Sequence, residues 1–285
     1  MKLYSNFRSS LSCFYSESFL FYFGEEMNIT NSLEVRYRDF KRLHLSLFSE
    51  GRELKQLKEI HSGKRCFIIG NGPSLKAEDL TRLSEAGEIT FAFNRIFHIF
   101  EDTPWRPTYY ISQDEKMLAG SIAEVNAIEV TRKFIPIEMH YYYGIDLEGI
   151  TPFHISSKNE VSTPGFSEDV VKCVENSMTV VYTAIQFAVY MGIKEIYLIG
   201  VDHHFHTSIN AQGEIVVDPT AKDYFSDVYN EDKKDLYIPN TDLSTLTFIA
   251  AKKYADAHGI KIYNATRGGK LEVFERKDFD SLFCS

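Results

Sequence analysis

The chain has 285 residues, of which 44% are hydrophobic and 25% charged, as in a globular protein that can bury a large core. A formal net charge of −9 excludes broad nucleic-acid binding, which depends on a basic surface. The four cysteines (Cys13, Cys66, Cys173 and Cys284) lie far apart, with neither zinc-site nor disulfide spacing. We therefore expect a cytoplasmic protein with at most peripheral association at the inner membrane face, and the sequence leaves its oligomeric state open.

The N-terminal quarter is predicted to stand apart from a catalytic domain at residues 63–285. Residues 14–23 are rich in aromatic side chains but too short and too polar to span a membrane. They also lack a cleavage site, so residues 1–26 are interpreted as an extension. Residues 33–60 carry leucines at helical spacing, and Gly51 is predicted to divide them into two helices.

A short apolar run at 66–69 leads into a glycine-rich turn, and a polar segment typical of a helix follows. Such a strand, turn and helix places backbone N–H groups and a helix dipole where a phosphate can bind. Ser74 is expected to cap the next helix, and Pro73 is tolerated near a helix start. The alternative is an ordinary connection between strand and helix. The turn consists of Gly70, Asn71, Gly72, Pro73 and Ser74.

The remaining pattern alternates strands with helices. Strands are predicted at 89–93, 108–112, 133–137, 195–200 and 261–264, and helices at 77–85, 117–130, 179–191 and 243–258. Residues 138–178 and 207–240 lack a clear period and are predicted to be lid segments. The alternation predicts an α/β, Rossmann-like fold, with a mostly parallel sheet flanked by helices and an irregular lid insertion.

Polar residues follow five of the predicted strands. Because ligands of open α/β sheets bind beyond the carboxyl ends of the strands, we expect one nucleotide or donor site there. The basic residues in this set would neutralise a phosphate or carboxylate, or else are surface charges. Beyond the turn, the set contains Asn94, Arg95, Gln113, Asp114, Gly200, Asp202, His203, His204, His206, Asn264, Arg267 and Lys270.

The histidines suggest a general base rather than a metal site, because adjacent side chains on an extended segment point to opposite faces. Plain loop histidines are the alternative. Asp114 and Asp202 would either hold Mg²⁺ on a nucleotide phosphate or cap helices. No Asp-X-Asp pair is present, no Walker-type lysine follows Gly72, and no Gly-X-Gly-X-X-Gly follows the first strand. The sequence thus disfavours an ordinary P-loop kinase and a dinucleotide oxidoreductase.

The motif Gly70–Leu75, together with Asn94 and the unit 188–202, resembles the family 42 bacterial sialyltransferases. The tract Lys194-Glu195-Ile196-Tyr197-Leu198, followed by Gly200-Val201-Asp202, is particularly similar. The wider pattern, which adds 107–114 and 264–269, resembles the motility-associated Maf glycosyltransferases and the related archaeal 6-hydroxymethylpterin diphosphokinase. The resemblance covers roughly residues 64–275.

The resemblance implies an inverting, metal-independent enzyme with a GT-A-variant-like Rossmann fold and a CMP-activated nonulosonic acid as donor. It implies that Asn71, Ser74 and Asn94 bind the CMP moiety. Thr179 falls in the segment that contacts the donor in that family. Asp202 and His204 fall just past the second strong strand.

This chain also departs from the family pattern. Ser177 and Val180 stand where the family has an arginine and a serine, and His204 stands where a tyrosine assists phosphate departure. The family's general-base histidine precedes the last helix, yet residues 207–257 contain no histidine. The base is therefore expected among His203, His204, His206 and Asp242, or the reaction differs.

Together these features predict an inverting glycosyltransferase without metal or cofactor. It would move a sugar from a nucleotide-sugar donor, with a CMP-nonulosonate as one candidate, to a glycan or glycoprotein acceptor in surface polysaccharide or glycoprotein synthesis. One alternative is a Mg²⁺-dependent diphosphokinase acting on a pterin-like alcohol. The other is a non-catalytic nucleotide-binding protein.

Overall fold

The structure is a computed structural model that describes residues 29–156, 164–210, 212–218, 220–226 and 237–283. The chain divides into two compact units, Met1–Phe40 and Lys41–Ser285, which are treated separately. The described part of the first unit belongs to helix α1 (Ile29–Leu43), on whose surface Arg38 pairs with Glu34 one turn away. The predicted extension at 1–26 lies outside the described residues.

An eight-stranded sheet forms the centre of the second unit, and every neighbouring pair of its strands is parallel. The strands follow the order β10-β9-β6-β1-β2-β3-β4-β5, so the order reverses between β1 and β6. The predicted α/β fold with a mostly parallel sheet flanked by helices is confirmed. The strands are β1 (Arg65–Ile69), β2 (Ile89–Phe93), β3 (Tyr109–Ile111), β4 (Arg132–Pro136), β5 (Ile150–Phe153), β6 (Glu195–Ile199), β9 (Lys261–Asn264) and β10 (Glu275–Arg276).

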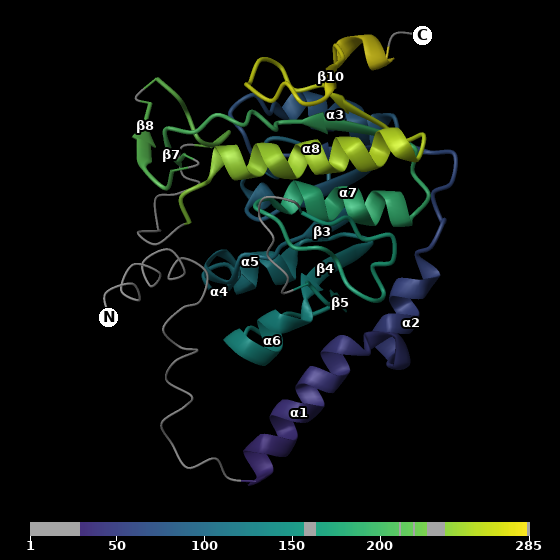
Figure 1. Ribbon diagram of the computed structural model, residues 1–285. Coiled ribbons are helices and arrows are strands. Elements are labelled where there is room, and N and C mark those ends of the chain that lie inside the picture. The colour runs from purple at the N-terminus through teal and green to yellow at the C-terminus, as the bar shows by residue number, and fades with distance from the viewer. Residues whose placement is uncertain (1–28, 157–163, 211, 219, 227–236, 284–285) are drawn as a thin grey trace. The chain divides into compact units, whose positions relative to one another are not determined.

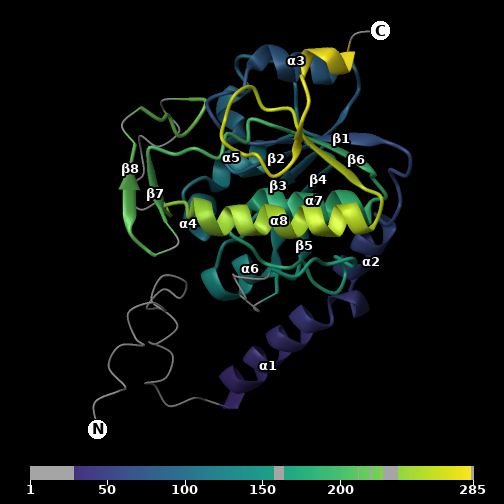
Figure 2. The same ribbon diagram turned by 45° about the horizontal axis from the view of Figure 1, so that its top comes forward.

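Side chains alternate between the two faces along each strand, so both faces of the sheet are apolar. Helices cover both faces. Cys66 and Ile68 of β1 face one apolar cluster, whereas Phe67 and Ile69 face the other. On the first face lie α2 (Ser49–Gln56), α7 (Val180–Tyr190) and α8 (Thr241–Ala257), and Figure 1 shows α7 and α8 side by side. On the second lie α3 (Ala77–Glu85), α4 (Glu115–Ala119) and α5 (Ile122–Ala127), and Figure 2 shows the sheet between α3 and α8.

Two helix predictions are corrected. The helical N-terminal region breaks at 44–48, where the 3₁₀ turn η3 (Leu45–Leu47) forms, and Gly51 lies inside α2. Gly51 is required there because a Cβ atom would lie 2.2 Å from the carbonyl oxygen of Leu45. The predicted helix at 117–130 is two helices, since Gly120 ends α4 and Ser121 begins α5.

The prediction of an irregular lid over 138–178 is wrong for its first half. Helix α6 (Ile137–Tyr143) follows β4 without a loop, and β5 adds an edge strand to the sheet. Pro152 interrupts the apolar pattern of β5, which is tolerated at an edge but hides the strand in the sequence. Residues 157–163 of this segment lie outside the described part of the chain.

The second predicted lid contains a two-stranded hairpin, β7 (Thr207–Ile209) and β8 (Ile215–Val217), paired antiparallel. In Figure 1 the hairpin lies beyond the N-terminal end of α8, and β7 contacts that helix. Further along the chain, the Phe225 N–H donates to the carbonyl of Asn71, in the turn that follows β1. Within the described residues, no helix has the length and apolar character needed to cross a membrane.

Candidate active site

The glycine-rich turn lies against the end of β6, at the point where the strand order reverses. The N–H of Gly70 donates to the Ile199 carbonyl and that of Gly72 to the Gly200 carbonyl, both at 2.8 Å. A Cβ atom on Gly70 would lie 2.3 Å from the Gly200 carbonyl oxygen. The backbones of the turn and of residue 200 are therefore too close for a side chain at position 70. Such a reversal is where open α/β sheets bind ligands.

A carboxylate occupies the mouth of this turn. Asp202 accepts the Ser74 hydroxyl at 2.7 Å and the Ser74 N–H at 3.4 Å, both at Oδ2. A Cβ atom on Gly72 would overlap the same oxygen at 1.9 Å. Burial raises the pKa of Asp202, and the hydrogen bonds from Ser74 act in the opposite direction. Ser74 thus bonds to Asp202, while α3 begins at Ala77 without a side-chain cap.

Amide side chains join the ends of β1, β2 and β3. Asn71 donates from Nδ2 to the Phe93 carbonyl at 3.1 Å, and Asn94 accepts the Ser112 hydroxyl at 2.9 Å. Asn94 adopts a φ of 48°, in the left-handed region that non-glycine residues seldom occupy. Arg95 directly follows and is 2% exposed, so its guanidinium is inside the protein.

Three predicted residues organise helix starts at the same edge of the sheet. Asp114 caps α4 by accepting the Met117 N–H at 2.9 Å, and burial raises the pKa of this carboxyl group. Thr179 caps α7. Gln113 accepts the Thr183 hydroxyl at 2.7 Å, which ties β3 to the first turn of α7. The N-terminal dipole of α7 is thereby directed at the carboxyl edge.

His203 also has a left-handed backbone, with a φ of 53°. Its Nε2 lies 2.8 Å from the hydroxyl of Thr245 on α8. Burial lowers the pKa of His203, and the carboxylate of Asp242 in the first turn of α8 partly offsets this effect. His203 and Asn94 both follow sheet strands, and backbone strain of this kind is concentrated at functional sites.

His204 points to different partners. Its Nε2 lies 2.8 Å from Asp218 Oδ2 and 2.9 Å from Lys270 Nζ. The backbone N–H of His206 donates to Asp223. The three histidines are therefore separated, and the described residues contain no cluster of three or more side chains suited to a metal ion.

The loop after β9 supplies one predicted cation to the site and keeps another away. The Lys270 N–H donates to the Asp202 carbonyl at 2.7 Å, which places the lysine beside His204. Arg267 instead pairs with Asp79 and Asp280 beside α3. Asn264 is 1% exposed and donates to the Leu271 carbonyl at 2.8 Å, so it braces the loop.

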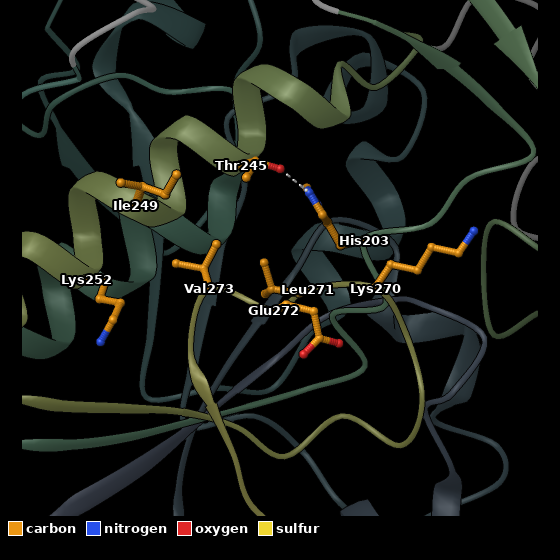
Figure 3. Close-up of a pocket in the computed structure, with 8 residues that line it drawn as sticks. All are labelled: His203, Thr245, Ile249, Lys252, Lys270, Leu271, Glu272 and Val273. Atoms are coloured by element: carbon orange, nitrogen blue, oxygen red, sulfur yellow. Dashed lines mark hydrogen bonds between the residues drawn. The ribbon is translucent and has the colours of Figure 1, made fainter.

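A groove of about 420 Å³ begins at His203 and runs along α8. Figure 3 shows Thr245 and Ile249 of the helix on one side, and Leu271 and Val273 on the other. Lys270 also lines the groove, and the end of its side chain extends away from the other lining residues. The groove therefore offers room for a ligand next to His203.

Comparison with known proteins now identifies the family. Residues 44–208 match the profile described as "6-hydroxymethylpterin diphosphokinase MptE-like". The chain belongs to the MptE-like family. Among solved structures, the MptE-like chain is similar to a Maf glycosyltransferase from Magnetospirillum magneticum AMB-1, with 14% identity and a TM-score of 0.47. That alignment covers 81% of this chain but only 38% of the Maf protein. No functionally curated protein matches the sequence.

The structure also brings in residues that the sequence reasoning missed, chiefly Asp218 and Thr245. Asp218 is 14 residues from His204, and Thr245 is 42 residues from His203. The one local signal was Asp218 with Thr220 two positions later, which is typical of a turn closed by the aspartate side chain.

Proposed function

We propose that the protein is an inverting glycosyltransferase that uses a nucleotide-activated sugar, with a CMP-nonulosonate as one candidate donor. The donor nucleotide would bind at the Gly70–Ser74 turn, and a glycan or glycoprotein hydroxyl would be the acceptor. One observation carries the proposal. The glycine-rich turn and two hydrogen-bonded histidines, His203 and His204, lie at the carboxyl ends of β1 and β6, where the strand order reverses.

The chemistry requires two kinds of group. An acceptor hydroxyl attacks the anomeric carbon, the bond from this carbon to the phosphate oxygen breaks, and the nucleotide leaves with the electron pair. Both hydrogen-bond donors of Ser74 are engaged by Asp202, so the N-terminus of α7, whose dipole is directed at this edge of the sheet, would stabilise the departing phosphate. The hydroxyl proton passes to a histidine, for which His204 is favoured because Asp218 holds its ring. Attack opposite the leaving group inverts the anomeric carbon.

The test is calorimetric titration with CMP, UDP, GDP and ADP in EDTA, followed by mass spectrometry of products from the matching nucleotide sugars. We expect one nucleotide to bind without metal and to be released during transfer. Asn71→Ala should weaken that nucleotide about tenfold, because an amide bridge between β1 and β2 is lost. Absence of binding by all four nucleotides would refute the proposal.

A second candidate function follows from Asp202. A carboxylate in a phosphate-binding turn repels phosphate unless a divalent cation lies between them, and Mg²⁺ bound to a nucleotide needs only one or two protein carboxylates. Asp202 fits that role, although Asp114 is engaged in capping α4. This supports a diphosphokinase, the activity in the family description, in which an alcohol attacks the β-phosphorus of ATP and AMP leaves.

Asp202→Asn separates the two candidates. The amide can still accept the Ser74 hydroxyl but carries no charge. For the glycosyltransferase, we expect metal-free nucleotide to bind about tenfold more tightly, since a negative charge beside the phosphate is lost. For the diphosphokinase, we expect binding of ATP with Mg²⁺ to fall by a similar factor. Isothermal titration of both ligands to both proteins decides the matter.

A further inference from the structure

Several hydrogen bonds fix the orientation of the Asp218 side chain. Its Oδ1 accepts the Thr220 N–H at 2.9 Å and the Thr220 hydroxyl at 2.6 Å. Its own N–H donates to the His206 carbonyl at 2.7 Å. The carboxylate therefore has a fixed orientation in which its second oxygen, Oδ2, lies toward His204.

The hydrogen bonds from Thr220, followed by the contact with His204, hold the pKa of Asp218 well below its usual range. An ionised carboxylate can only accept hydrogen bonds. The nitrogen that faces it at 2.8 Å, Nε2 of His204, must therefore carry the proton. In the neutral ring this leaves the lone pair on Nδ1, at the opposite side of the imidazole.

Lys270 adds a constraint at the same nitrogen. Its Nζ lies 2.9 Å from His204 Nε2 and 4.0 Å from Asp218 Oδ2. If the lysine donated to Nε2, that nitrogen would present its lone pair to the carboxylate 2.8 Å away, which is repulsive. The ammonium group instead pairs with the Asp218 carboxylate. Asp202 is a further charged group that interacts with His204.

We infer that Asp218 is a positioning residue that fixes His204 as the Nε2–H tautomer, so that Nδ1 receives the acceptor proton. This inference rests on the proposed transfer function. Asp218, directly after β8, is thereby part of the active site.

The tautomer can be measured without any substrate. Two-bond ¹H–¹⁵N correlation spectra of ¹⁵N-histidine-labelled protein distinguish the two neutral forms, and His204→Gln assigns the signals. We expect the Nε2–H form in the wild type and a mixture or the Nδ1–H form in Asp218→Asn, because the asparagine amide can also donate. Asp223→Asn is the matched control, since Asp223 contacts the backbone of the same segment but not the His204 ring.

Kinetics provide the second measurement. Asp218→Asn should lower kcat by about 100-fold or more with little change in donor KM, as expected for a misdirected general base.

The outcomes separate this inference from the proposed function. An Nδ1–H wild type, or an Asp218→Asn variant with an unchanged tautomer or unchanged kcat, would overturn the positioning role and leave transfer activity standing. A wild type with the Nε2–H tautomer that transfers nothing from any nucleotide would overturn the proposed function but support the hydrogen-bond assignment. The expected tautomer together with the expected kinetic changes would support both.

Discussion

The two halves of the candidate site are built in different ways. The Gly70–Ser74 turn is fixed by backbone hydrogen bonds to β6 and has no room for a further atom at Gly70 or Gly72. The segment from His203 to His206 is instead held by side chains of α8, the hairpin and the loop after β9. The first half therefore depends on shape, whereas the chemistry of the second depends on charge and protonation.

The largest expected effect breaks the first half. Gly70→Ala should lower the free energy of unfolding by about 3 kcal/mol, because its methyl group meets the Gly200 backbone and cannot be accommodated by a rotamer change. Urea denaturation measures this loss. Gly63→Ala is the control, since Gly63 has a φ of 74° but open space around it, and should cost about 1 kcal/mol. Equal losses would show that the close approach does not matter.

A smaller effect is expected at the loop after β9. Arg267→Gln should destabilise the protein by about 2 kcal/mol because it leaves Asp79, which is 7% exposed, without its cation. We expect nucleotide affinity to stay within about twofold, since Arg267 is directed toward α3 and away from Asp202. Denaturation and calorimetry on the same variant test this. A folded variant that binds nucleotide more than tenfold less tightly would assign Arg267 to the site.

A third prediction concerns pH and the second half. The lowered pKa of His203 means that the unfolded chain binds a proton at a higher pH than the folded protein does. Stability therefore falls as the pH drops below about 6.5 and is unaffected above it. His203→Asn removes this group while keeping a residue that tolerates a positive φ.

Urea denaturation at about pH 7.5 and about pH 5.5 should thus show a smaller loss of stability for His203→Asn than for the wild type. The wild type measured under the same two conditions is the reference. If His203→Asn lost as much stability as the wild type, His203 would not be the titrating group.

The smallest effect is expected on the hairpin surface. Ile215 on β8 is 63% exposed, so Ile215→Lys should change the free energy of unfolding by less than about 0.5 kcal/mol and leave transfer unchanged. Thermal unfolding and the transfer assay measure both. Ile215 lies three residues from Asp218, so the variant compares substitution of an exposed β8 side chain with substitution of the hydrogen-bonded carboxylate. A loss above about 1.5 kcal/mol would show that β8 is covered by other parts of the protein.

The sequence predicted the secondary structure that depends on local residue patterns. Strands β2 and β9 and helix α3 have the bounds expected from apolar runs and glycine stops, and β1 starts one residue early. It failed at β5, where Pro152 breaks the pattern, and at α6, which starts directly after a strand. In the candidate site, the sequence identified the polar residues at the strand ends. It did not identify their partners, because Asp218 and Thr245 reach the histidines only through tertiary packing.

The contact between Ser74 and Asp202 joins residues 128 positions apart. Closing a loop of that size is entropically costly and is repaid only after β6 has paired with β1. The isolated segment from β1 to α3 therefore lacks the partner that shapes its turn. During folding, the candidate site is therefore completed only when the two halves of the sheet join. Nucleotide binding by a partly synthesised or refolding chain would report that event directly.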